Sequence, residues 1–408
     1  MKILNVVPSL LPAAGGPSRT VPGLCEGLTA TGATVTLFTT HEPGNDLTVD
    51  PASANYEVCL FGGNERSLRS ARQIYQTIKK RAGDFDLVHV HSLWNQISTV
   101  ACAAARSAGL PYVLAPLGML STTCVRQRHF AQKRIFAAVY DRRTVAGAAR
   151  LHLASADELE TLVTGWFQYP PHFIARNGTA PMGSSEPGTW RGRFPELKNR
   201  RIMLFFGRLH SIKGLDLQLE ALSLLKQTYS DLMWVLIGPD AGEWNRLNHA
   251  VRARGLEDHV RWIGPLMGDE RFAALADADV LVHTSFYESQ AMTINEALAV
   301  GVPLVITDSV NYEDVRRAGA GHIVSRSASA VAAAIDSIFQ DPAGSVAMRE
   351  AGRRFAAAEL SWSRIAESVT KSYEEILSEQ RKSLSFPMAL PKRQGPRVNK
   401  RIDWNQGT

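Results

Sequence analysis

Two glutamates spaced eight residues apart, Glu288 and Glu296, are the first candidates for chemistry in this sequence. The apolar run at 280–284 predicts a buried strand before them, and Ile294 and Leu298 fall on the buried face of a predicted helix. Glu288 is therefore expected on a strand-to-helix loop and Glu296 inside the helix that follows.

The spacing of the two glutamates limits what they can bind. In open parallel α/β sheets, ligands bind at the carboxyl ends of the strands. Eight helical residues rise by about 12 Å along the helix axis. That separation is too long for one metal ion or one shared proton, and it suits an elongated ligand that is held at two points.

A second group of candidates lies in the stretch 206–214, which follows a predicted strand. Arg208 and Lys213 supply two cations there, and Gly207 lies beside them near the start of a predicted helix. Free N–H groups at a helix N-terminus bind anions, and neighbouring cations can hold a diphosphate. The competing interpretation is that the cations are solvated and the glycines only turn the chain. Diphosphate binding is favoured because a carboxylate-bearing loop lies in the same half of the sequence.

The loop with Gly15 and Gly16 follows the first predicted strand and occupies the equivalent corner of the first half. Two phosphate-binding corners would then face each other across a cleft. The stretch 206–214 does not match the GxxxxGK[ST] loop of nucleotide triphosphatases, and no GxGxxG follows the first strand.

The elements that must position these residues alternate between strand and helix patterns. Strands are predicted at 2–7, 34–39, 87–91, 111–115, 151–154, 172–175, 201–206, 232–237, 260–263, 280–284 and 321–324. Helices are predicted at 18–31 with Ser18 as the N-cap, and at 67–81, 97–108, 215–228, 244–254, 327–339, 344–358 and 363–379. The polar region that ends near residue 66 has no clear pattern. Alternation of this kind predicts an α/β protein with doubly wound parallel sheets.

The length of 408 residues suggests two domains of about 150–200 residues each. Residues 177–200 are rich in Gly, Pro, Ser and charge, and we interpret them as the interdomain connection. The first domain then covers 1–176 and the second 201–362, with a basic tail at 380–408 that is predicted to be disordered. A cleft between two such domains is the expected ligand site.

The net charge of +6 comes from the tail, because residues 381–408 hold seven Lys or Arg and one acid. The rest of the chain is balanced, which argues against nucleic-acid binding. The four cysteines are widely spaced and are expected to be reduced thiols. The first residues fit a strand better than a signal peptide, and no apolar run is long enough for a transmembrane helix. We therefore expect a cytoplasmic protein, with the inner face of the plasma membrane as a second location.

A basic stretch at 126–143 has two interpretations. Apolar and aromatic residues, among them Phe130, are interleaved with its cations, which include Arg126, Arg128, Lys133 and Arg134. A helix of this composition could lie on an anionic membrane or contact a lipid-diphosphate acceptor. A solvated face above an ordinary core stripe explains the same pattern equally well.

Together these features resemble the family 4 (group 1) retaining glycosyltransferases, which have the GT-B fold. The features are the Gly15-Gly16 loop, the strand that ends at His91, the stretch 207–214 and the Glu288/Glu296 pair, and the likeness extends over about 375 residues from Lys2. The segments 87–95 and 116–119 look most like the bacterial exopolysaccharide and lipopolysaccharide members. The resemblance implies two Rossmann-like domains that face each other, with a last helix that crosses back onto the first domain.

The resemblance also implies roles for the residues that bind a nucleotide-sugar donor. Arg208 and Lys213 would neutralise the departing diphosphate, Glu288 would bind hydroxyls of the donor sugar, and Glu296 would bind the ribose. Backbone N–H groups at Met292 and Thr293 would add to the diphosphate site.

The resemblance implies two further roles in the first domain. It also shows one place where this sequence departs from the family. Gly16 would let backbone amides approach the phosphate, and His91 would lie near the transferred sugar. Many members have an aromatic residue and a glycine where this chain has Gln290 and Ala291. We therefore expect Ser289 and Gln290 to alter the contacts with the donor sugar.

The expected reaction is transfer of a sugar to a glycan or lipid-linked acceptor with retention of configuration. No DxD signature is present, so neither a metal ion nor another cofactor is expected. A nucleotide-sugar epimerase shares the two-domain architecture and is the first alternative. A non-catalytic partner in glycan assembly, with a relic site, is the second.

Overall fold

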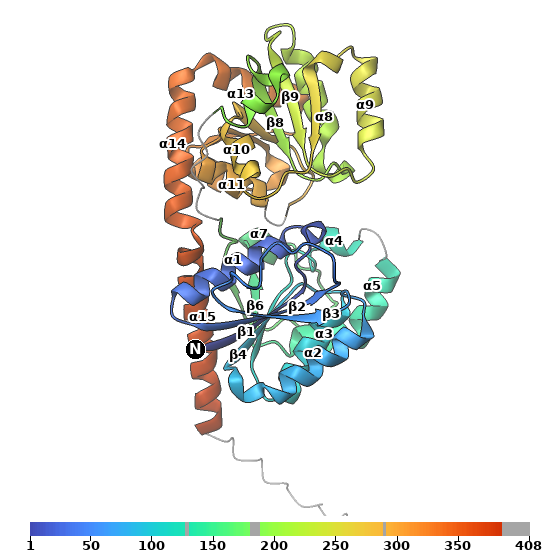
Figure 1. The fold of residues 1–408 in the computed structure, drawn as a ribbon, viewed down its shortest axis with the longest axis vertical. Coiled ribbons are helices and arrows are strands. Elements are labelled where there is room, and N and C mark those ends of the chain that lie inside the picture. Colours follow the sequence, from blue (N-terminus) through green and yellow to red (C-terminus); the bar gives the residue numbers. More distant parts are fainter. Residues whose placement is uncertain (127–129, 180–187, 289–290, 386–408) are drawn as a thin grey trace, which may run out of the picture.

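The computed structural model describes residues 1–126, 130–179, 188–288 and 291–385. Arg128, Ser289, Gln290 and the tail beyond residue 385 lie outside the described residues. Figure 1 shows two α/β domains, one above the other, with a run of helix along one side of both.

The first domain contains a seven-stranded sheet in the order β3-β2-β1-β4-β5-β6-β7, with all neighbouring strands parallel. Its strands are β1 (Lys2–Ser9), β2 (Thr34–His41), β3 (Glu57–Gly62), β4 (Leu87–His91), β5 (Tyr112–Ala115), β6 (Arg150–Leu153) and β7 (His172–Ile174). Its helices are α1 (Pro17–Ala30), α2 (Leu68–Lys80), α3 (Gln96–Ser107), α4 (Thr122–Arg126), α5 (Phe130–Phe136), the π-helix η3 (Ala137–Asp141), α6 (Arg142–Ala146) and α7 (Ala156–Glu160). Short 3-10 turns lie at η1 (Pro12–Ala14) and η2 (Ala82–Asp84).

The second domain contains a six-stranded parallel sheet in the order β10-β9-β8-β11-β12-β13. Its strands are β8 (Arg201–Phe206), β9 (Leu232–Ile237), β10 (Val260–Gly264), β11 (Val280–His283), β12 (Leu304–Thr307) and β13 (Gly321–Val324). Its helices are α8 (Leu215–Leu225), α9 (Trp244–Ala253), α10 (Asp269–Ala276), α11 (Met292–Val300), α12 (Asp314–Ala318), α13 (Ala328–Gln340) and α14 (Pro342–Glu359), and α15 (Trp362–Ser385) follows them. The predicted doubly wound parallel architecture is confirmed.

Two local predictions, at β3 and at the start of α1, differ from the structure. β3 was not predicted, because it is an edge strand with a half-exposed, irregular pattern. Ser18 does not cap α1, since Gly16 is the N-cap and Pro17 takes the first helical position, which suits its fixed φ. The Ser18 hydroxyl instead donates to Gly15 O at 2.8 Å.

The later part of the predicted connection 177–200 is built into the second domain. Trp190 and Leu197 are buried in the core on one face of the second sheet. Arg191 donates through its backbone N–H to Asp277 at 2.6 Å and through its side chain to Asp279 at 3.1 Å. The segment contains too few apolar residues for its sequence to reveal this packing.

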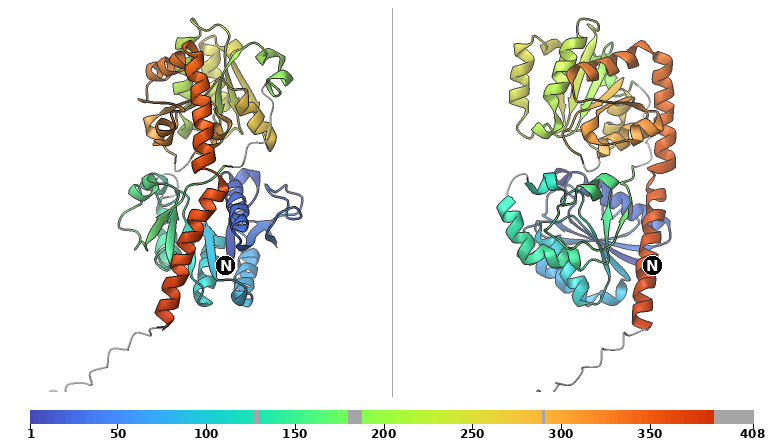
Figure 2. Two further views of the ribbon diagram at one scale, coloured as in Figure 1. Left: turned by 90° about the vertical axis from the view of Figure 1, so that its left-hand side faces the viewer. Right: turned by 180° about the vertical axis from the view of Figure 1, so that it is seen from behind.

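The last helix, α15, returns to the first domain as the resemblance implied. Figure 2 shows α14 and α15 end to end across both domains. Apolar residues of α15 (Ile365, Ala366, Val369, Tyr373 and Ile376) join the core that α1 and β1 form on one face of the first sheet. Where the chain passes between the domains, Thr179 N donates to Leu360 O at 2.7 Å.

The contact between α1 and α15 depends on glycines. Gly23 and Gly27 lie one turn apart on α1, beneath Trp362. A Cβ at Gly27 would lie 2.5 Å from the backbone oxygen of Trp362, which cannot rotate away as a side chain could.

We expect Gly27→Ala to destabilise the protein by about 1–3 kcal/mol, the usual cost of overpacking, because α15 must move away from α1. Urea unfolding would measure the change. Gly83→Ala is the matched control, since a Cβ there meets no atom within 4 Å. Equal stability of the two variants would contradict this account of the helix contact.

Candidate active site

Two loops at the carboxyl ends of neighbouring strands, β8 and β11, are held together by their backbones. Phe286 N donates to Ile212 O at 2.8 Å, and the Thr284 hydroxyl contacts Lys213 O at 3.1 Å and Gly214 O at 3.0 Å. Gly214 has φ +64° and begins α8, and a Cβ there would collide with Thr284 O. Only glycine fits this position without moving the loops apart.

The joined loops bring Lys213 to Glu288. The two side chains form an ion pair and are 17% and 14% exposed. The same oxygen, Glu288 Oε1, lies 2.9 Å from His283 Nε2 and accepts a hydrogen bond from the Ser285 hydroxyl at 2.8 Å. Burial by itself would raise the pKa of Glu288, but His283 and Lys213 outweigh it and hold that pKa well below its usual range. Glu288 is therefore an anion at neutral pH, and the described residues donate no hydrogen bond to its other oxygen.

Glu296 lies on α11 and forms a buried ion pair with Arg271 of α10. The side chains of Arg271 and Glu296 are only 8% and 6% exposed. The Arg271 guanidinium lies over the rings of Phe206, at 5.5 Å, and Phe272, at 5.8 Å. Arg271 Nε and Glu296 Oε2 have no hydrogen-bond partner among the described residues. A buried carboxylate oxygen without a donor is suited to accept one from a ligand.

The N-terminus of α11 lies beside the end of β8. The Thr293 hydroxyl donates to Phe206 O at 3.1 Å and fixes the helix start against that strand. The backbone N–H groups of Met292 and Thr293, in the first turn, have no acceptor within the helix. Gly207 is half-buried and the Arg208 side chain is exposed, directly after β8. This corner therefore offers free N–H groups and a cation.

The first domain contributes its own glycine loop. Gly15 has φ +82°, and a Cβ at Gly15 or Gly16 would meet no atom within 4 Å. Arg19 lies on α1 behind this loop, and part of its side chain is exposed. Desolvation and the like charge of Arg271 lower the pKa of Arg19, while Glu296 raises it. This coupling places the start of α1 near the Arg271–Glu296 pair of the second domain.

His91, which the resemblance places near the transferred sugar, is buried at the end of β4. Its side chain is 2% exposed, and its Nε2 lies 3.0 Å from Asn5 Oδ1. The rings of His91 and His89 are 4.0 Å apart, and His89 lies 2.7 Å from the hydroxyl of Tyr373 on α15. Burial, helped by the nearby His152, lowers the pKa of His91 to about 3. This arrangement supports a neutral core histidine and gives no support to a sugar contact.

The loop after β11 also reaches the first domain. The Tyr287 side chain lies close to Ser121 and Thr161. Nearby, the Asn311 side chain donates to Asp157 at 2.6 Å. The residue next to Glu288 therefore lies at the junction of the two domains.

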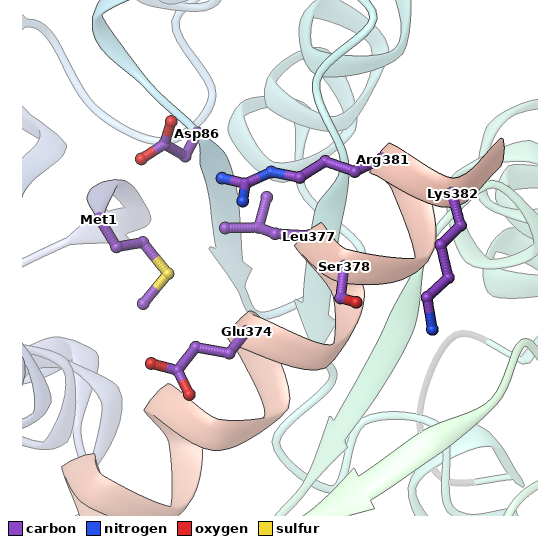
Figure 3. A pocket seen from close by; sticks show the side chains of 7 residues that line it. All are labelled: Met1, Asp86, Glu374, Leu377, Ser378, Arg381 and Lys382. Atoms are coloured by element: carbon purple, nitrogen blue, oxygen red, sulfur yellow. The ribbon is translucent and has the colours of Figure 1, made fainter. Parts of the chain in front are cut away.

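The basic residues of the stretch 126–143 lie apart from the loops that carry Lys213 and Glu288. Arg126 ends α4, Arg134 is exposed on α5, and Lys133 Nζ donates to Cys124 O at 2.6 Å. A hollow of about 460 Å³ is also separate from these loops (Figure 3). It lies between Met1, Asp86 and the end of α15, at the opposite ends of the strands from the loops above.

Among the described residues, no three His, Cys, Asp or Glu side chains gather as a metal site requires. No helix in the described ranges is long and apolar enough to cross a membrane. All four cysteines are free thiols, and Cys25 and Cys102 are buried.

Sequence analysis missed Arg271, His283 and Ser285. His283 lies within the predicted strand 280–284 and ends β11 in the structure, so its position beside Glu288 could have been inferred from the alternation of strand residues. Arg271 gave no such signal, because a single arginine in a short helix is usually solvated. Ser289 and Gln290 lie outside the described residues.

Known proteins that resemble this chain over most of its length are glycosyl transferases. The profile described as "Glycosyl transferases group 1" matches residues 188–355, and the "Glycosyl transferase 4-like domain" matches residues 15–176. A phosphatidyl-myo-inositol mannosyltransferase of Mycobacterium leprae is 24% identical over 92% of this chain and 97% of its own length. A D-inositol 3-phosphate glycosyltransferase of Pseudarthrobacter chlorophenolicus is 27% identical over 88% of this chain and 90% of its own length.

Solved structures share the fold. A sucrose-phosphate synthase of Thermosynechococcus elongatus superposes with a TM-score of 0.72 at 20% identity, over 93% of this chain and 100% of that one. The HepE protein of Anabaena, crystallised in complex with UDP-glucose, gives a TM-score of 0.71 at 19% identity, over 92% and 100%.

We expect Arg271→Leu to cost about 3–5 kcal/mol of stability, because it leaves the buried Glu296 carboxylate unpaired. Adding Glu296→Leu should restore most of that loss. Chemical denaturation of the two single variants and the double variant measures the coupling. The control is Arg354→Leu, which removes an exposed ion pair with Glu350 and should change stability by less than about 1 kcal/mol. A double variant less stable than Arg271→Leu would contradict the pairing.

Proposed function

Since this chain belongs to the group 1 glycosyl transferases of GT-B fold, we propose that it transfers a sugar from a nucleotide-sugar donor to a glycan or lipid-linked acceptor, with retention of configuration. The observation that carries the proposal is the Lys213–Glu288 pair, which lies at the carboxyl ends of β8 and β11 near the free N-terminus of α11. The cations and the amide N–H groups match the diphosphate of a nucleotide sugar, and the carboxylate matches its hydroxyl groups.

The diphosphate would bind to positive charge that is already in place. Arg208 and Lys213 supply the cations, and the N–H groups of Met292 and Thr293 supply the helix N-terminus. Negative charge grows on the diphosphate as the bond to the sugar breaks. Preorganised donors stabilise that charge without reorganisation, so we propose that no metal ion is needed.

The two glutamates would bind the ends of the donor. Glu288 Oε2 can accept hydrogen bonds from sugar hydroxyls, because Lys213, His283 and Ser285 all bind the other oxygen. Glu296 Oε2, which lacks a donor in this structure, can accept one from the ribose. The Gly15-Gly16 loop of the first domain leaves space for a phosphate to approach its backbone.

Neither glutamate is proposed as a nucleophile. Retaining glycosidases place two carboxyl groups about 5 Å apart across the scissile bond, whereas Glu288 is bound to Lys213 and Glu296 to Arg271. We propose front-face attack, in which the leaving phosphate accepts the proton of the acceptor hydroxyl. No side chain of this protein then needs to act as the base that removes the proton of the acceptor hydroxyl.

We also propose a role for this protein in polysaccharide biosynthesis, of the exopolysaccharide or lipopolysaccharide type, at the cytoplasmic side of the membrane. The mannosyltransferase and inositol-phosphate relatives are named for acceptors that carry phosphate, and HepE was crystallised with UDP-glucose. UDP-sugars therefore belong in any donor panel.

The test is nucleotide release and labelled product from a panel of UDP-, GDP- and ADP-sugars with bacterial lipid extract. Lys213→Gln should lower kcat by about 100-fold or more, because an electrostatic contact to the leaving group is lost. Glu288→Gln should also lose activity, while Arg246→Gln, on an exposed surface, should retain it.

Two outcomes would replace the proposal. Conversion of the donor without any acceptor would identify an epimerase. If no nucleotide or nucleotide-sugar bound, and Arg208→Ala and Glu288→Ala left glycan assembly unchanged, the chain would be a non-catalytic partner.

A further inference from the structure

A cavity of about 270 Å³ lies on the first domain, away from the Lys213–Glu288 pair. Six residues line it: Arg134, Ala137, Arg142, Thr164, Gly165 and Trp166. Figure 1 shows α4 and α5 on the side of this domain opposite α15, and the view from behind in Figure 2 agrees. The volume is close to the lower limit of about 300 Å³ for small-molecule sites, so the cavity suits a head group and not a whole nucleotide sugar.

Two guanidinium groups give the cavity its chemistry. Arg142 Nε donates to Trp166 O at 3.1 Å, which fixes the side chain and leaves both terminal nitrogens without a partner among the described residues. Arg134 is exposed and forms no ion pair with the described part of the chain. A planar guanidinium with free terminal nitrogens can bind two phosphate oxygens at once.

No exposed carboxylate of this segment competes for the cations. Asp141 is the one acid among the described residues of 122–146, and its side chain is fully buried. Burial raises the pKa of Asp141 to about 7, and the hydroxyl of Thr99 only partly offsets this. The surface around the cavity is therefore positive, through Arg126, Lys133, Arg134, Arg142 and Arg143.

Apolar side chains project beside the cations. Phe130, Ile135, Val139 and Tyr140 are 43%, 67%, 57% and 50% exposed, and we call these four residues the apolar patch. The ring of Phe130 lies 5.5 Å from that of Trp166, so this residue of the apolar patch adjoins the cavity. Exposed apolar residues that gather beside cations are typical of a surface that contacts lipid.

The segment that lines the cavity follows a residue of the domain junction in the sequence. Thr161, which lies close to Tyr287 of the second domain, precedes the lining residues Thr164–Trp166 by only a few positions.

We propose that this cavity binds the phosphate group of a lipid-linked acceptor, while the apolar patch receives its hydrocarbon chain. The inference rests on the proposed glycosyl transfer for its meaning as an acceptor site, and its binding step can be tested separately. Neighbouring cations and apolar groups match the two halves of a phospholipid-like molecule, whereas a soluble sugar phosphate would leave the apolar patch unused.

The binding test uses the full chain and sedimentation with vesicles of phosphatidylcholine, with or without phosphatidic acid as a lipid phosphate. Arg134→Gln with Arg142→Gln should weaken binding to the phosphatidic acid vesicles by about tenfold or more, at roughly fivefold per cation. Arg143→Gln is the control, because it removes one cation from α6 outside the cavity lining and should change binding much less than either cavity substitution alone. Ile135→Ser with Val139→Ser tests the apolar patch and should also weaken binding.

Each other outcome overturns the inference. Equal losses from Arg143→Gln and from the cavity pair would mean a diffuse charge effect. Loss of inorganic pyrophosphate binding in the cavity pair, with vesicle binding unchanged, would mean a soluble phosphate ligand. Absence of vesicle binding by the wild-type chain would exclude a lipid.

A donor-side readout separates this inference from the proposed function. The cavity variants should raise the KM for lipid extract and leave nucleotide-sugar binding unchanged, since no lining residue belongs to the donor site. If the wild-type chain bound no nucleotide sugar, glycosyl transfer would fail while the vesicle result stood. If the cavity pair lost donor binding as well, the assignment of the cavity to the acceptor would fail.

Discussion

The candidate site depends on the close approach of two backbones at Gly214 and Thr284. The Thr284 carbonyl occupies the space that any side chain at residue 214 would need, and its hydroxyl contacts both Lys213 O and Gly214 O. This contact holds the ends of β8 and β11 at a fixed separation, so that Lys213 reaches Glu288 in the free protein. The cost of bringing charges together is then met by folding and not by ligand binding.

The features that could be predicted from sequence are those set by local pattern. Alternating strands and helices gave the parallel sheets, and the apolar run at 280–284 placed Glu288 on the loop after a strand. The position of Lys213 followed from the same rule, because carboxyl ends of parallel strands share one edge of a sheet. β3 was missed since an edge strand is only half covered, and its burial pattern is irregular.

The features that could not be predicted depend on contacts between distant segments. Arg271 is 25 residues before Glu296, and only the packing of α10 against α11 shows that the two side chains form a buried pair. The resemblance implied that His91 would lie near the transferred sugar. In the structure its ring is buried, and α15, more than 260 residues later, covers that face of the sheet and brings Tyr373 to His89. A helix that returns from the far end of the chain cannot be placed by any local pattern.

The same returning helix defines how the domains can move. The chain passes between them twice, before the second domain and again between α14 and α15, and the two passages are joined where Thr179 N meets Leu360 O. Domain hinges are usually a few residues at loops or element ends, and these two adjacent segments are the places where this chain could bend. Asn295, the neighbour of Glu296, donates to Asn177 O at 2.9 Å on the first passage. Bending at these segments would therefore change the distance between the Gly15-Gly16 loop and the second domain, while the start of α11 stays close to the first segment.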